Sequence, residues 1–434
     1  MLKKALTPID NAPLVLFRII FGFLFVCESF GAIATGWVRS NLVDVQMTFS
    51  HIHMDWLQPL PGYGMYFYFA FMGIVSIAVL LGYRYRWSMI MLTLLWAGVY
   101  YMQKTSYNNH YYLMLVICFY MCFLPAHKYA SLDVKQGRVR EELAIPAYCS
   151  WLLIFQIALV YIYGTVAKFY PDWLDGTFVK IMYGSINAPD FFKEIFTQPW
   201  FYIAISYLGI LYDGLIIPLL LWRRTRTLAV VASLFFHLFN SITLQIGIFP
   251  YFALSFALFF YDPDFIRAKF LKKKPKMSVE DYSFSIPTWK VSVLGVFVLF
   301  QLLLPLRHHL IAGDVLWTDE GHRLSWRMML RSRGGYTNFF VEEKGTGQRL
   351  EYPLDERLST KQRNRVSTPD MIWQMAQRIK KEYAAKGIDV AVYAESWVSI
   401  NGREYSKFVD EEVDLGAVKW NYFGHNEWIL PKPF

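Results

Sequence analysis

Three basic side chains lie at the ends of long apolar runs or within them, and these are the residues best placed to do chemistry. Lys168 directly follows Ala147–Ala167, a run without a charge, and precedes the aromatic and acidic segment Phe169–Trp173. A lysine at this point can extend its amine to lipid headgroups. Alternatively, an amine held half out of water can lose its proton and act as a base. Taken alone, Lys168 favours the headgroup interpretation, because functional lysines inside membranes are uncommon.

His110 and His237 each stand beside asparagine residues. His110 directly follows Asn109, and His237 shares a predicted helical face with Ser233 and Asn240. Such histidines either exchange protons with a bound substrate or only hydrogen-bond to neighbouring backbone. Each histidine alone favours the structural interpretation, so the question is whether the fold brings them and Lys168 together.

Other ionisable groups also fall inside apolar runs, where an unpaired charge is costly. Arg18 and Glu28 lie in the first run, about 15 Å apart along a helix and therefore unable to pair with each other. Asp213 lies in the middle of a later run. We expect an Arg18–Asp213 ion pair that holds two helices together.

The sequence excludes several familiar chemistries. It contains no phosphate-binding GxxxxGK[ST] loop, no GxGxxG after a strand and no GxSxG nucleophile motif. The close histidine pairs, His51/His53 and His308/His309, lack a second set of ligands, so we expect no metal. A redox or acid–base site inside a membrane is what remains.

The elements that must position these residues are membrane helices. The chain has 434 residues, of which 55% are hydrophobic and 18% aromatic, too apolar for an ordinary soluble protein of this length. The apolar segments lie within residues 13–306. They predict nine spans: 13–35, 65–82, 87–102, 110–125, 147–168, 200–222, 227–243, 247–261 and 288–306.

The loop charges predict the orientation of these spans. With a cytoplasmic N-terminus, the inner loops hold most of the Lys and Arg residues, including the run at 272–276. The outer loops then hold only Arg39, Lys104, Lys180 and Lys193. This asymmetry is the positive-inside pattern, which explains the net charge of +9 without nucleic-acid binding. It also places Lys168, His110 and His237 at the same outer depth, which favours a site over three separate structural roles.

Residues 307–434 read as a soluble domain on the outer side, in the periplasm or a lumen. Strand-like segments cover 324–330, 337–342, 349–352 and 390–400, and an amphipathic helix covers 369–386. We therefore expect an all-α polytopic membrane bundle of about nine helices over residues 1–306. A C-terminal extramembrane β-rich α+β domain over 307–434 completes the predicted fold.

Five segments of the chain resemble the vitamin K-dependent γ-glutamyl carboxylase family, in the same order along the sequence. The most specific pieces are the NNH at 108–110, the K-x₃-DW-x-[DE]-G pattern at 168–176 and the FH-x₂-NS-x₄-IG-x-FPY pattern at 236–251. The five segments are QKTSYNNHYYLMLVICFYMCFLPAHKYASLD (103–133), VAKFYPDWLDG (166–176), FHLFNSITLQIGIFPY (236–251), WTDEGHRLSWRMMLRSR (317–333) and YAESWVSINGREYSKFVDEEVD (393–414). Animal members extend further and use lumenal cysteines, so the resemblance is to a compact, bacterial-type member.

The resemblance implies an integral-membrane enzyme that oxidises reduced vitamin K, or a menaquinol-type quinol, with O2 to the epoxide. The oxygenated quinone takes a proton from the γ-carbon of a glutamate in a peptide or protein, and CO2 adds to that carbon. Family roles transfer onto Lys168 as the active-site amine, onto His110 as the histidine that stabilises the transition state, and onto His237.

Further residues are expected around these three. The resemblance and the apolar setting place Asn109, Tyr161, Trp173 and Asn240 around the quinol. Asp172 and His322 are expected to support the substrate site.

Two alternatives stay open from the sequence. The protein could oxidise the quinol but carboxylate a non-protein substrate, or it could be a non-catalytic membrane scaffold or transporter that retains the fold. In each case the expected surroundings are a lipid bilayer, with the N-terminus in the cytoplasm and no nucleic acid.

Overall fold

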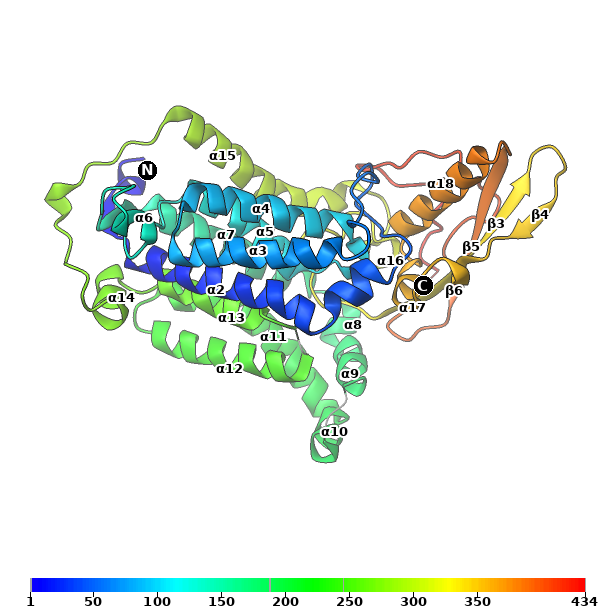
Figure 1. The fold of residues 1–434 in the computed structure, drawn as a ribbon. Coiled ribbons are helices and arrows are strands. Elements are labelled where there is room, and N and C mark those ends of the chain that lie inside the picture. The colour runs from blue at the N-terminus through cyan, green and yellow to red at the C-terminus, as the bar shows by residue number, and fades with distance from the viewer. Residues whose placement is uncertain (1, 187–188, 245, 434) are drawn as a thin grey trace.

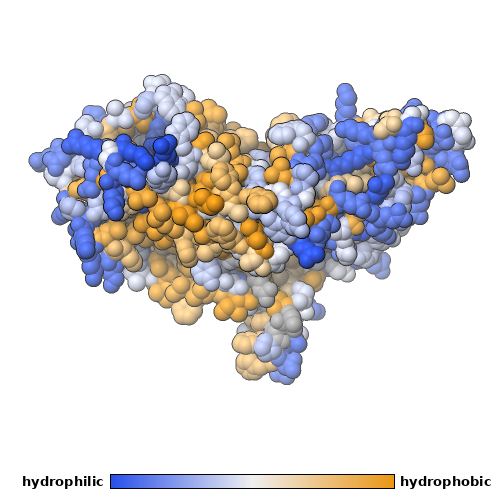
Figure 2. All heavy atoms as spheres, in the orientation of Figure 1, coloured by the Kyte–Doolittle hydropathy of each residue, from blue (hydrophilic) through white to orange (hydrophobic). Residues whose placement is uncertain are grey.

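The computed structural model describes residues 2–186, 189–244 and 246–433. Long helices run side by side in a bundle, and a smaller domain that contains a β-sheet caps one end of it (Figure 1). The N-terminus lies at the opposite end of the bundle (Figure 1). An apolar belt covers the visible face of the bundle, whereas polar residues gather at its N-terminal end and over the cap (Figure 2). This distribution is that of a membrane bundle with an extramembrane domain.

Every predicted span falls on a helix, but the count of nine is not confirmed. Among the described residues, six helices are long and apolar enough to cross a bilayer: α2 (Ala12–Ala34), α3 (Gly64–Leu81), α7 (Tyr148–Ala167), α11 (Pro199–Leu221), α12 (Arg226–Leu244) and α15 (Thr288–Leu303) with its continuation to Leu310. The other three predicted spans fall on α4 (Tyr85–Met102), α5 (Asn109–Phe123) and α13 (Phe249–Ser255), whose apolar helical stretch continues to Phe259. With 15 residues, α5 is about 22 Å long, shorter than the roughly 30 Å of a hydrocarbon core.

Short elements connect these helices at the two ends of the bundle. The strands β1 (Pro8–Asp10) and β2 (Ala144–Pro146) pair at the N-terminal end. The remaining short helices are α1 (Leu2–Ala5), α6 (Leu132–Lys135), α8 (Pro171–Leu174), α9 (Thr177–Gly184), α10 (Asp190–Phe196) and α14 (Pro263–Phe270). Helices α9 and α10 project sideways from the capped end of the bundle (Figure 1).

The predicted Arg18–Asp213 ion pair is wrong. The buried guanidinium of Arg18 donates to the backbone carbonyls of Ala126 at 3.0 Å, Val79 at 3.1 Å and Ala130 at 2.7 Å, and also to that of Leu80. Two of these carbonyls, those of Val79 and Leu80, belong to the last turn of α3, where helix carbonyls lack the usual partner four residues ahead. Arg18 therefore satisfies the end of a helix, and Asp213 is left for another partner.

The C-terminal domain is an antiparallel sheet in the order β4-β3-β5-β6 with one long helix packed on it. Its elements are α16 (Val315–Thr318), β3 (Arg333–Glu343), β4 (Arg349–Glu351), α17 (Thr360–Arg365), α18 (Pro369–Ala385), β5 (Val390–Ile400) and β6 (Ser406–Lys407). Met371, Met375 and Ile379 of α18 are buried in one core with Val392 and Ala394 of β5. This apolar face was expected, because the sequence of α18 repeats apolar residues at helical spacing.

Candidate active site

Lys168 is turned into the protein at the capped end of α7. Its amine lies 2.5 Å from Oδ2 of Asp213 on α11 and donates to the carbonyl of Gly164 at 3.2 Å. The ring of Trp173 lies beside the amine, with its centroid 5.3 Å away. Lys168 is only 7% exposed. The amine is therefore held inside the protein by an acid, a carbonyl and an aromatic face.

His237 forms a second cluster with Tyr161, one helix turn before Thr165 on α7. The Tyr161 hydroxyl and His237 Nε2 are 3.2 Å apart. The ring of Tyr212 on α11 packs edge-on against Tyr161 and stacks on Phe236 at 3.9 Å. His237 is thus a buried hydrogen-bonding group in an aromatic setting. Asn240 lies half-buried on the same helix, and no described contact joins it to Lys168 or the histidines.

Phe249 connects His237 to His110. The ring centroid of Phe249 lies 5.1 Å from that of His110 and 6.1 Å from that of His237. Both histidine rings therefore contact the same phenylalanine, whereas no described contact joins either of them to Lys168. Asn109 does not orient His110: its side chain donates to the carbonyl of Arg327 at 2.9 Å and accepts from the Tyr107 hydroxyl at 3.1 Å.

The segment Asp319–Arg333 passes between the bundle and the outer domain and carries much of the site. The prediction of a strand at 324–330 is wrong here. Leu324, Trp326 and Met329 have φ angles of +62°, +56° and +49°, a left-handed conformation that a strand excludes. Trp326 is fully buried and stacks on Tyr112 at 4.7 Å, so tertiary packing overrides the local apolar pattern. Strained backbone of this kind concentrates at functional sites.

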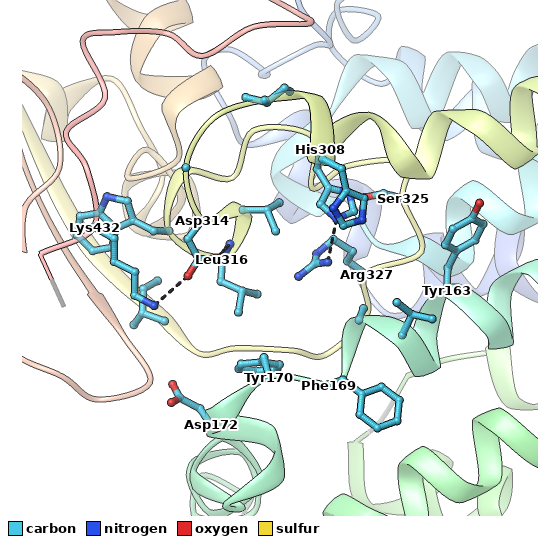
Figure 3. A pocket seen from close by; sticks show the side chains of 18 of the residues that line it. Tyr163, Phe169, Tyr170, Asp172, His308, Asp314, Leu316, Ser325, Arg327 and Lys432 are labelled. Carbon is cyan, nitrogen blue, oxygen red and sulfur yellow. Dashed lines mark hydrogen bonds and ion pairs between the residues drawn. The ribbon is translucent and has the colours of Figure 1, made fainter.

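Two cavities meet at this segment. The first, of about 800 Å³, lies between the end of α7, the end of α15 and the outer domain (Figure 3). Its wall combines apolar residues with a few polar ones, among them Ile162, Val166, Phe169, His308 and Arg327. Ile162, Val166 and Phe169 are each more than half exposed, so this side opens toward the lipid.

The second cavity, of about 760 Å³, is strongly basic. His110, Asn109 and His322 line it together with the cations Lys104, Arg323, Arg327, Arg331, Arg333, Lys361 and Arg365. Burial lowers the pKa of His322 to about 3, and Arg331 adds to the effect, so the imidazole is neutral at pH 7. A cavity with this lining favours an anionic ligand.

A buried ion cluster forms part of the wall of the basic cavity. The amine of Lys104 lies 2.7 Å from Oδ2 of Asp370 on α18 in an ion pair, and Asp370 also accepts from two nitrogens of Arg323, each at 3.2 Å. Burial alone would raise the pKa of Asp370, but Arg323 and Lys104 together lower it far below its usual value. Burial lowers the pKa of Lys104 to about 8 against the opposing effect of Asp370.

Asp172 ties the Lys168 region to the outer domain. Its two carboxylate oxygens accept from Arg403 at 2.5 and 2.6 Å, and Asn401 donates to it at 2.7 Å. The hydrogen bond from Arg403 is the main cause of the lowered pKa of Asp172. Asp172 lines the first cavity (Figure 3), but its oxygens are engaged between domains.

Sequence reasoning missed two features of this region. Asp213 was noticed but given the wrong partner, because the sequence does not show which helix faces its side chain. Arg327, which lines both cavities, was not singled out. The available signal was the repeated arginine at 323, 327, 331 and 333 in an otherwise apolar and aromatic stretch. In the described part of the chain, no three His, Cys, Asp or Glu side chains come together as metal ligands.

Two family models match the chain in sequence. The HTTM domain matches residues 6–265. The vitamin K-dependent gamma-carboxylase, lumenal domain, matches residues 286–433. The chain belongs to the vitamin K-dependent γ-glutamyl carboxylase family. No solved structure matches it.

Membership in the carboxylase family fits the membrane-type bundle and the strand-containing outer region. It points to a carboxylase-like enzyme, and the name of the second domain points to a lumenal position for the C-terminal part. The family also points to vitamin K quinol, O2 and CO2 as reactants.

Proposed function

We propose that this protein is an integral-membrane peptidyl-glutamate γ-carboxylase. It couples oxidation of a reduced vitamin K-type quinol by O2 to the addition of CO2 at a glutamate γ-carbon. Residues 1–306 form the catalytic bundle, and residues 307–434 cap it on the periplasmic or lumenal side, with the N-terminus in the cytoplasm. The observation that carries the proposal is the buried Lys168 amine, which pairs with Asp213; Lys168 itself lines neither cavity, but its neighbours Ala167 and Phe169 line the lipid-facing one.

The lipid-facing cavity suits the quinol. Ala167 and Phe169, which flank Lys168 in sequence, both line it. Its exposed apolar wall allows a lipid-soluble molecule to arrive from the bilayer, and its inner wall offers polar groups to the ring oxygens (Figure 3). Quinol and O2 give the epoxide and water, and this oxidation supplies the strong base that the carboxylation needs.

Lys168 is the group that takes the quinol hydroxyl proton. To do so it must first become a neutral amine, and Asp213, 2.5 Å away in the resting ion pair, can take up the ammonium proton. Burial keeps bulk water away from the pair. This exclusion protects the oxygenated quinone, a base strong enough to deprotonate carbon, from being quenched by water. Tyr161 and His237 form the adjoining hydrogen-bonded wall, and Trp173 covers the amine.

The basic cavity suits the glutamyl substrate. It holds His110 and the neutral His322, which donate hydrogen bonds to charge that develops during the reaction. The excess of cations around them attracts a peptide carboxylate from the outer side.

One assay separates this function from its two alternatives. Protein in lipid nanodiscs is incubated with reduced vitamin K, labelled bicarbonate and a glutamate-containing peptide, and both peptide label and epoxide are measured. We expect both products from the native protein and neither from Lys168→Ala. The matched control is Lys180→Ala, which removes an exposed lysine of α9 on the same side and should keep full activity.

Each other outcome points to a specific alternative. Epoxide without peptide label indicates a non-protein substrate, and labelling of small carboxylates in place of the peptide would identify it. Neither product from well-folded native protein would reject both enzymatic functions. Near-normal turnover by Lys168→Ala would reject only the assignment of Lys168 as the base.

A further inference from the structure

Arg327 differs from the other charged residues around the two cavities. Five charged residues line the lipid-facing cavity, and four of them pair with each other there. Lys432 donates to Asp314 at 2.9 Å, and Arg403 donates to Asp172 at 2.5 and 2.6 Å. Among the described residues, Arg327 is the lining cation that no carboxylate neutralises.

The same contrast holds in the basic cavity. Lys104 and Arg323 share Asp370, and Arg331 and Arg333 share Asp319. The lining cations without a carboxylate in the described part of the chain are Arg327, Lys361 and Arg365. Lys361 and Arg365 are exposed at the outer side, whereas Arg327 is half-buried beside Asn109.

The immediate contacts of Arg327 leave its charge unsatisfied. Its Nη1 lies 3.4 Å from Nε2 of His308, whose Nδ1 is 2.8 Å from the carbonyl of Pro305 (Figure 3). Its Nε is buried and has no hydrogen-bond partner in the described structure. Burial, with Arg331 as the next contributor, lowers the pKa of Arg327 to about 10, which still leaves a full positive charge at pH 7. A desolvated cation without an anion is costly unless a ligand supplies one.

We infer that Arg327 binds the γ-carboxylate of the glutamyl substrate, an inference that rests on the proposed function. The exposed Lys361 and Arg365 lead an acidic side chain inward, and Arg327 is the inner cation of that path. The γ-carbon is one bond from the carboxylate carbon. A carboxylate held by a guanidinium that lines both cavities therefore places the γ-carbon toward the quinol cavity.

Arg327 would also assist the removal of the γ-proton. When that C–H bond breaks, its electron pair delocalises into the adjacent carboxylate, which then carries two negative charges. A guanidinium that binds both oxygens neutralises part of this charge at the moment it develops. His308, held by the carbonyl of Pro305, keeps the guanidinium in place as a positioning residue.

The first test is a binding experiment that needs no turnover. Native protein in nanodiscs is titrated with a glutamate peptide and with the same peptide carrying glutamine. We expect the native protein to prefer the glutamate peptide. Arg327→Gln should bind that peptide about 10- to 150-fold more weakly, which is the usual loss of affinity when a hydrogen bond to a charged group is removed. Lys381→Gln is the matched control, because it removes an exposed cation of the outer domain that lines neither cavity, and it should change binding less than about threefold.

The second test measures release of tritium from γ-tritiated glutamate in the peptide, together with epoxide formation. Arg327→Gln should slow tritium release by a further 10²- to 10³-fold, as expected for a lost oxyanion donor, while the quinol concentration for half-maximal rate stays unchanged. Arg327→Lys should recover part of the binding but little of the proton release, because it lacks the two-pronged geometry.

The outcomes distinguish this inference from the proposed function. Equal binding of both peptides by the native protein, or native-like binding by Arg327→Gln, would overturn the role of Arg327. If Arg327→Gln needed a higher quinol concentration for half-maximal rate but bound the peptide as the native protein does, Arg327 would bind a quinol oxyanion. That result would overturn its assignment to the glutamyl carboxylate. Absence of epoxide and tritium release from the native protein would reject the proposed function, while the binding titration would still decide the carboxylate site.

Discussion

The Lys168–Asp213 pair allows a quantitative test of how the active-site amine is held. Both side chains are 9% exposed and the charged atoms are 2.5 Å apart. Removing one partner of a buried pair leaves an uncompensated charge, which costs about 3–5 kcal/mol, whereas replacing both by apolar residues is close to neutral. We therefore expect Asp213→Leu to lower the free energy of unfolding by roughly 3 kcal/mol, and Lys168→Met/Asp213→Leu to restore most of the loss.

The measurement is a double-mutant cycle of unfolding in mixed micelles, followed by tryptophan fluorescence. A second cycle on Lys128 and Glu142 provides the control. That pair is nearly as close, at 2.8 Å, but its side chains are 24% and 30% exposed, so its coupling should stay below about 1 kcal/mol. A Lys168–Asp213 coupling no larger than the control would show that the amine is not held as a buried ion pair.

The double variant also separates stability from catalysis. Because Lys168→Met/Asp213→Leu should fold as well as the native protein, loss of epoxide formation in that variant cannot be ascribed to misfolding. If the double variant retained activity, neither residue could be the proton acceptor for the quinol.

Three further predictions concern the connection between the bundle and the outer domain. Asp370→Asn should destabilise the protein by about 3 kcal/mol. Because Arg323 and Lys104 lower the pKa of Asp370 in the folded protein, its contribution to the free energy of unfolding is complete at neutral pH. This contribution declines as the pH falls below about 4, the pKa of an aspartate in the unfolded chain. Denaturation at pH 7 and at pH 3 measures the decline. Arg403→Gln should cost no more than about 1 kcal/mol, because that side chain is 39% exposed, but it should speed hydrogen exchange in α8, where Asp172 lies. A cysteine at the exposed position of Gly345 should react with an impermeant maleimide from the periplasmic or lumenal side, whereas one at exposed Lys135 should react only from the cytoplasm.

Patterns that depend on one element alone were predicted well from the sequence. The strand at 390–400 matches β5 at both ends, because its alternating residues face a core on one side. The helix predicted at 369–386 matches α18 to within one residue. The common depth of Lys168, His110 and His237 stays a prediction, because the contact that both histidines make with Phe249 does not define their depth in a membrane.

Features that depend on how elements rotate against each other could not be predicted. Asp213 has a helical position that the sequence shows, but whether it faces Arg18 or Lys168 depends on the packing of α11 against α7. The apolar pattern around Trp326 predicted a strand. Its left-handed backbone instead accompanies packing on Tyr112 and hydrogen bonds from Asn109 and to Tyr107, which the local sequence does not show. The two cavities lie beside this segment, so their lining residues could not be foreseen either.

The outer domain is best understood as the lid of the proposed reaction site. The helices of the bundle end near Lys168. A base strong enough to deprotonate carbon, formed there, must be protected from the surrounding water. Polar contacts hold the domain over this end at several places, among them Asp172 with Arg403, Lys104 with Asp370, and Lys361 with Asn41. Each joins a residue of the bundle end to one of the domain, and the two cavities lie among them. A lid fixed at several points leaves the quinol a path through the lipid-facing wall and the peptide a path past Lys361 and Arg365, so each substrate reaches Arg327 from its own phase.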